Sequence, residues 1–181
     1  MNWKTQLLRL EQSKDWKTAI NLLEETIKQD SNSIEAYLSM NYLLMNLLVE
    51  EQYDSKEHDY YAELLKKYFI ESYSKFFDEA EYLFYIGQIA CMSEWYFDID
   101  IEKAHSMMKK ASELEPNNIL YKWANYIDLD MCELSNKKII ILYSKNALSV
   151  PAVIMDLESK GALGKYLFGL LEYWAKQEIK N

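Results

Sequence analysis

Residues 101–118 read IEKAHSMMKKASELEPNN, and this stretch carries the clearest indication of the fold. Small side chains at Ala104 and Ala111 share one face of a predicted helix and would let a second helix approach closely, while Met108 fills the space between them. Pro116 cannot continue the helix. The stretch therefore predicts a closely packed helix followed by a tight turn.

A second pattern of the same kind occupies the N-terminal region. Apolar residues recur at three- and four-residue steps in two sets: Trp3, Leu7 and Leu10, then Trp16, Ile20, Leu23 and Ile27. Ser33 can cap a third helix that begins at Ile34. That helix places Tyr37 34 residues after Trp3, which indicates a repeating pair of helices.

Both patterns resemble the tetratricopeptide repeat family, whose unit is two helices in about 34 residues. The matching residues are Trp3, Leu7, Ala19 and Leu23 in the first unit, and Ala104, Met108, Ala111 and the turn Pro116–Asn118 in the later one. Ile86 and Gly87 resemble the large–small pair of a first helix. Ser31 departs from the pattern, because the family favours proline there. The resemblance is most specific over 3–37 and 101–118.

The resemblance implies an all-α fold: a right-handed solenoid of about four helical hairpins in one domain, 1–181, with a C-terminal closing helix. The composition also favours helices, since 4 Gly and 2 Pro are few for a fold rich in turns. We expect a polar loop at 50–59, a long helix near 60–77, helices near 119–132 and 138–148, a kink at Pro151, and a final helix near 165–179. Tyr166, Leu170, Tyr173 and Trp174 lie on one side of that final helix.

The charge and the apolar runs indicate the class of partner. The net charge is −9, and residues 31–100 hold 14 acids against 4 lysines. Such a field repels nucleic acid and attracts basic proteins. No apolar run reaches the length of a membrane span, no secretory signal is visible, and two cysteines make no disulfide framework. We therefore expect a cytoplasmic protein.

Several residues that suggest chemistry have a simpler explanation. Glu102 and His105 have a metal-site spacing, but bundle metal sites need a second such pair, which the chain lacks. Cys91 and Cys132 are more typical of buried structural cysteines than of nucleophiles. The sequence GALGK at 161–165 has the wrong spacing for a phosphate loop. We expect no enzyme activity and no catalytic, cofactor-binding or metal-binding residues.

The candidate site lies in two irregular segments. From Gly87 to Ala104 is 17 residues, against 12 from Leu7 to Ala19, so residues 95–99 form an excess of about five. Aromatic residues among acids are typical of protein interfaces. The predicted partner-binding residues are Glu51, Tyr53, Asp54, Glu57, Asp59, Tyr60, Glu94, Trp95, Tyr96, Asp98 and Asp100. The alternative is that these aromatics only pack the loops onto the solenoid.

These features lead to two functional hypotheses, both of them non-catalytic. The general character of the chain, small, acidic and helical, resembles bacterial immunity proteins that bind and neutralise basic, nuclease-type toxins. In this hypothesis, acids would speed association and tyrosine and tryptophan would be the buried anchors. The alternative is a tetratricopeptide adaptor or scaffold that binds a peptide in its concave groove.

Overall fold

The computed structural model describes residues 2–127 and 132–178, and every regular element in these two ranges is helical. The elements are α1 (Trp3–Gln12), α2 (Trp16–Gln29), α3 (Ile34–Glu50), the short 3-10 helix η1 (Ser55–Glu57), α4 (His58–Phe76), α5 (Ala80–Ala90), α6 (Glu94–Phe97), α7 (Ile101–Leu114), α8 (Ile119–Ala124), α9 (Leu134–Leu148), α10 (Pro151–Ser159) and α11 (Gly161–Ala175). The all-α prediction is confirmed.

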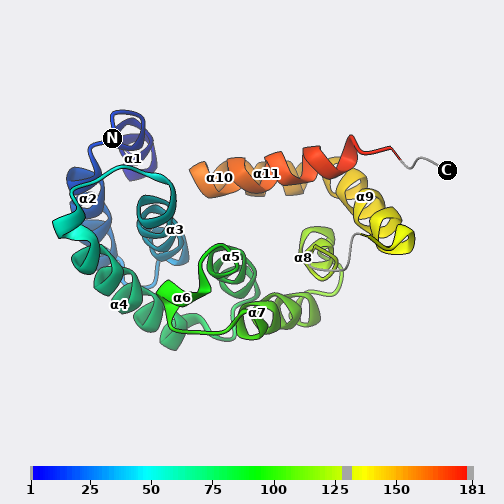
Figure 1. Ribbon diagram of the computed structural model, residues 1–181, viewed down its shortest axis with the longest axis horizontal. Helices are drawn as coiled ribbons and strands as arrows, with labels where there is room; N and C mark the ends of the chain where they lie inside the picture. The colour runs from blue at the N-terminus through cyan, green and yellow to red at the C-terminus, as the bar shows by residue number, and fades with distance from the viewer. Residues whose placement is uncertain (1, 128–131, 179–181) are drawn as a thin grey trace.

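The helices follow an arc, with its inner side formed by α3, α5 and α8 and its outer side by α2, α4, α7 and α9 (Figure 1). Neighbours along the chain pack together: α1 on α2, α2 on α3, α3 on α4, α5 on α7 and α8 on α9. Each inner helix thus has a partner on the outside of the arc. The core between the two layers is apolar and rich in tyrosine and phenylalanine.

Side-chain caps fix where several helices begin, because the first backbone N–H groups of a helix have no partner within it. Asp15 accepts from the backbone of Thr18 at 3.3 Å, and Ser33 accepts from that of Ala36 at 3.3 Å. Asn118 accepts from the backbone of Leu120 at 3.1 Å. The predicted role of Ser33 as a cap is confirmed.

The contact predicted from the small residues of the quoted stretch is present between α5 and α7. A Cβ atom built on Gly87 would lie 2.6 Å from Cγ of Met108 and 3.0 Å from the backbone oxygen of Ala104. Such distances leave no room for a side chain at residue 87. Gln88 also donates to Sδ of Met108 at 2.8 Å. Glycine at residue 87 therefore sets how closely the two helices approach.

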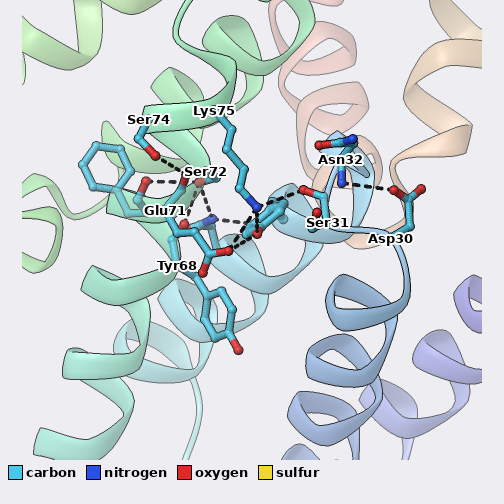
Figure 2. A network of polar contacts seen from close by, with 11 residues as sticks. Asp30, Ser31, Asn32, Tyr68, Glu71, Ser72, Ser74 and Lys75 are labelled. Carbon is cyan, nitrogen blue, oxygen red and sulfur yellow. Dashed lines mark hydrogen bonds and ion pairs between the residues drawn. The ribbon is translucent and has the colours of Figure 1, made fainter.

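A polar network joins α3 to α4 (Figure 2). The hydroxyl of Tyr37 donates to Glu71 and accepts from Nζ of Lys75 at 2.9 Å. Lys75 also donates to the backbone oxygen of Ser31 at 3.1 Å, which ties the turn before α3 to α4. The hydrogen bond from Tyr37, followed by that from Lys75, holds the pKa of Glu71 below its usual value. The network therefore fixes the register of α4 against α3.

The C-terminal end differs from the prediction of one closing helix. The predicted kink at Pro151 corresponds to a bend of 84° between α9 and α10, and Pro151 is the first residue of α10, where its missing N–H costs nothing. Helices α10 and α11 form a hairpin that lies across the open side of the arc (Figure 1). Helix α11 contacts α9 and α10 and also reaches α1 and α3. The hairpin thus joins the two ends of the arc.

An ion-pair cluster holds the turn of this hairpin against the inner helices. The side chain of Lys160 is 6% exposed, and its Nζ pairs with Glu81 of α5, with Glu35 of α3 at 3.7 Å and with Asp156 of α10 at 3.2 Å. Lys4 of α1 pairs with Glu35 at 2.6 Å. Burial alone would lower the pKa of Lys160, but Glu81 and Asp156 outweigh it and leave that pKa raised.

The four residues predicted to share one side of the last helix do not form its buried stripe. The buried stripe of α11 is Leu163, Gly164, Leu167 and Leu171. Tyr166 and Tyr173 are exposed, and Leu170 and Trp174 are half-buried. Both faces are apolar, so the helical period could not distinguish between them.

Helix α8 ends at Ala124, earlier than the predicted boundary near 132, and residues 128–131 of that predicted helix lie outside the described ranges. Within these ranges no single helix is long and apolar enough to cross a membrane. Helices α9 and α10 reach that length and composition only as a pair, and they are bent by 84° where they meet.

Candidate protein-interaction surface

The structure brings the two predicted segments together through His58. The hydroxyl of Tyr53 lies 2.6 Å from Nδ1 of His58, and the two rings are stacked with centroids 6.1 Å apart. On its other side, the His58 ring lies 5.7 Å from that of Tyr96. A histidine at the start of α4 thus joins the loop after α3 to the short helix α6. Nothing in the sequence had indicated this bridging role of His58.

The aromatic cluster continues to either side of this junction. Tyr61 is buried and meets Tyr53 edge-on, with centroids 5.5 Å apart. Tyr60 lies beside Tyr61 and is 55% exposed. Trp95 lies beside Tyr96 and is 61% exposed. We call these six residues the aromatic cluster: Tyr53, His58, Tyr60, Tyr61, Trp95 and Tyr96. It has a buried base and two exposed ends.

The five-residue excess at 95–99 had been expected to be a loop. Its first three residues instead belong to the short helix α6, which begins at Glu94 and ends at Phe97. Phe97 is 1% exposed and meets Phe69 of α4 edge-on, with centroids 5.1 Å apart. Asp98 ends the turn with φ of 58°, a left-handed conformation that aspartate tolerates better than most residues. Burial of Phe97 therefore anchors α6 and leaves Trp95 facing outward.

Most of the predicted acids have partners within the chain. Three form ion pairs: Glu51 with Lys14 at 2.8 Å, Glu57 with Lys17 at 2.6 Å and Asp98 with Lys66 at 2.6 Å. Two cap helices, since Asp54 accepts from the backbone of Lys56 and Asp100 from that of Lys103. Hydrogen bonds from Lys17 and Lys66 hold the pKa values of Glu57 and Asp98 below their usual range.

Two of the predicted acids remain unpaired. Within the described ranges the side chains of Asp59 and Glu94 have no hydrogen-bond or ion-pair partner. They flank Tyr60 and Trp95 in the sequence. The lysines that neutralise Glu51 and Glu57 come from α1–α2, outside residues 31–100, so the local charge is smaller than the sequence count indicated. Free negative charge therefore stands beside the two exposed aromatics.

The groups that suggested chemistry lie elsewhere. Glu102 is exposed and His105 half-buried on α7. Residues 2–127 and 132–178 contain no cluster of three or more histidine, cysteine or carboxylate side chains placed to hold a metal ion. The prediction of buried cysteines was wrong for Cys132, which is exposed, and too strong for Cys91, which is half-buried at the end of α5.

Comparisons with protein-family models, with curated proteins and with solved structures gave no match for this chain.

Proposed function

We propose that this chain is a non-catalytic protein-binding module of tetratricopeptide-like helical hairpins that binds and neutralises a basic, nuclease-type toxin in the cytoplasm. One observation carries the proposal: Trp95 and Tyr60 are exposed at the two ends of one aromatic cluster whose base is buried. Exposed tryptophan and tyrosine on a fixed support are the residues that anchor protein interfaces.

The support beneath these residues matters for affinity. Trp95 rests against Tyr96, and Tyr60 against the buried Tyr61. Side chains already held in place lose less conformational entropy when a partner covers them. The cluster is therefore suited to serve as a preorganised anchor.

The charge around the anchors favours a basic partner. Asp59 and Glu94 are unpaired beside them, and the chain as a whole carries a net charge of −9. Negative potential around an apolar anchor raises the association rate with a positively charged protein and repels nucleic acid. Many nuclease toxins are basic, because they bind the phosphates of nucleic acid.

Helix packing supports the tetratricopeptide-like part of the proposal. The close approach of α5 and α7 at Gly87, Ala104 and Met108 is the large–small packing that the family uses. The adaptor hypothesis is less favoured, because the hairpin turn at Lys160 already occupies Glu35 and Glu81 on the inner helices.

Co-expression with a tagged copy tests the proposal. We expect one basic protein in equimolar complex, with affinity reduced at least tenfold by Trp95→Ala together with Tyr60→Ala, since each hot-spot side chain is worth about 2 kcal/mol. Tyr173→Ala is the matched control, because Tyr173 is 56% exposed on α11, away from the cluster. Equal losses from the cluster and control variants, or no basic partner, would contradict the proposal.

A second measurement isolates the charge. Asp59→Lys with Glu94→Lys should lower the association rate constant at low salt and leave it nearly unchanged at high salt, where screening is strong. Glu113→Lys, on the exposed face of α7, is the control with the same type of charge change. A rate that does not depend on salt in the unmodified protein would exclude steering by these acids.

A further inference from the structure

A groove of about 990 Å³ lies beside the closing hairpin, between α1, α3, α10 and α11. Its apolar lining includes Leu8 of α1, Trp16 at the start of α2, Tyr42 of α3 and Phe168 of α11. This volume is within the range of pockets that enclose a drug-sized ligand or several side chains of a peptide. Of the predicted partner-binding residues, only Glu51 lines this groove.

A carboxylate without a partner stands in this apolar setting. Glu11 lines the groove, and within residues 2–127 and 132–178 its side chain has no hydrogen-bond or ion-pair partner. Burial raises the pKa of Glu11 to about 7 from the ordinary 4.5. Glu11 is half-buried, and a carboxylate in such an apolar setting is stabilised as an ion when a cation or hydrogen-bond donors meet it.

The other charges around the groove favour a cation as that missing partner. Glu51 and Glu158 also line it, against one lysine, Lys165. Glu51 is already paired with Lys14. The remaining unpaired acids therefore leave the groove complementary to an apolar group that carries a positive charge.

The α11 wall of the groove allows a chain to come close. A Cβ atom built on Gly169 would meet nothing within 4 Å, although Gly169 lies within the helix and lines the groove. Glycine in a helix interior is unfavourable by about 1 kcal/mol relative to alanine, so its presence needs a reason. Close approach of a ligand backbone is such a reason.

We propose that this groove binds an apolar segment of the partner protein bearing a lysine or arginine, with the cation paired to Glu11 and the apolar side chains along Trp16, Tyr42 and Phe168. The inference rests on the proposed protein-binding function and names a second contact for the same basic partner. Glu51, which lines the groove, is two residues from Tyr53 of the aromatic cluster. The groove and the cluster are therefore close enough for one partner to reach both.

Fluorescently labelled peptides provide the test. One is an amphipathic leucine–lysine helix, the second its leucine–glutamate counterpart, and the third a serine–lysine peptide with the same charge and no apolar face. We expect the leucine–lysine peptide alone to bind by fluorescence anisotropy. Glu11→Gln should weaken that binding at least tenfold, and Gly169→Trp, which fills the groove, should abolish it. Glu113→Gln, on the exposed face of α7 and outside the groove, is the matched control and should bind within threefold of the unmodified protein.

Two results would overturn the groove proposal. One is equal affinity for the leucine–lysine and leucine–glutamate peptides, and the other is unchanged binding by Glu11→Gln and Gly169→Trp when circular dichroism shows both variants folded. The same variants separate this inference from the proposed function. A partner complex weakened by Trp95→Ala but not by Glu11→Gln or Gly169→Trp would refute the groove and leave the function standing. Absence of any basic partner would refute the function.

Discussion

Two glycines of the same helix should respond in opposite ways to the same substitution. A Cβ atom on Gly164 would overlap the backbone carbonyl oxygen of Leu157 and lie 2.6 Å from its carbonyl carbon. A Cβ atom on Gly169, five residues later in α11, would meet open space. The obstacle at Gly164 is the backbone of α10, which cannot rotate away as a flexible side chain could.

The magnitudes follow from two opposing effects. Alanine in place of glycine gains about 1 kcal/mol of helix stability at either residue. At Gly164 the hairpin must also open, and forcing an extra carbon into a packed contact costs about 1–3 kcal/mol or more. Because the contact is with backbone, we take the upper end of that range, for a net destabilisation of about 2 kcal/mol. Gly169→Ala should instead stabilise the protein by about 0.5–1 kcal/mol.

Thermal and urea unfolding of both variants measure this difference. For a chain of this size 1 kcal/mol shifts the melting temperature by about 2–4 °C, so Gly164→Ala should lower it by about 4–8 °C. Gly169→Ala should raise it by about 1–4 °C. If Gly164→Ala is as stable as Gly169→Ala, α10 and α11 do not pack as closely as described, and the account of the closing hairpin is wrong.

Other substitutions test further parts of the structure. Lys160→Met should destabilise the protein by about 2–3 kcal/mol in urea unfolding. This is less than the usual cost of breaking a buried ion pair, because the carboxylate partners of Lys160 keep contact with water. An effect under about 0.5 kcal/mol would refute the ion-pair cluster. Since burial raises the pKa of Glu11 to about 7, the fold loses stability as pH rises from 4.5 to 7. A pKa difference of this size corresponds to about 3.4 kcal/mol, and because Glu11 is only half-buried, we expect Glu11→Gln to be more stable than the unmodified protein by about 2 kcal/mol at pH 8 but not at pH 4. A constant difference across that range would contradict this. Asp98→Asn should leave the melting temperature nearly unchanged, whereas Asp98→Val should lower it. The reason is that asparagine tolerates the left-handed backbone at residue 98 and valine does not. Equal melting temperatures of the two variants would show that α6 ends in another way.

Local patterns in the sequence predicted the parts of the fold that depend on local physics. The caps at Ser33 and Asn118 involve residues two or three apart, and the small residues at Gly87 and Ala104 belong to neighbouring helices. Helical period and capping chemistry are enough to recognise such features. The start of α3 at Ile34 and the end of α7 before Pro116 were therefore predicted close to where they occur.

Contacts between distant parts of the chain were not predictable in this way. Nζ of Lys4 donates to the backbone oxygen of Ser159 at 3.2 Å, across 155 residues of sequence. No periodic pattern records such a pair. The ion pairs of Glu51 with Lys14 and of Glu57 with Lys17 also join distant parts of the sequence and could not be predicted. The expected number of unpaired acids in the candidate site was therefore too high.

The candidate site was predicted in composition but not in geometry. Aromatics among acids identified both irregular segments, yet nothing in the sequence indicated that His58 would hold Tyr53 and Tyr96 together. The sequence did not show that Phe97 differs from its neighbours Trp95 and Tyr96, although its burial anchors the segment. Residues 95–97 thus contain both the buried Phe97 and the exposed Trp95, and which of them faces outward is decided only by the folded backbone.

The contact of α11 with α1 and α3 changes how the chain should unfold. In an open array of repeats each unit contacts only its neighbours, so the ends fray independently and stability is nearly additive along the chain. Here the first and last helices support each other, so loosening either end exposes the other. Deleting α10 and α11 should therefore increase amide hydrogen exchange in α1 as well as near the cut. During synthesis, Glu35 and Glu81 lack their shared lysine until the last helices have emerged from the ribosome.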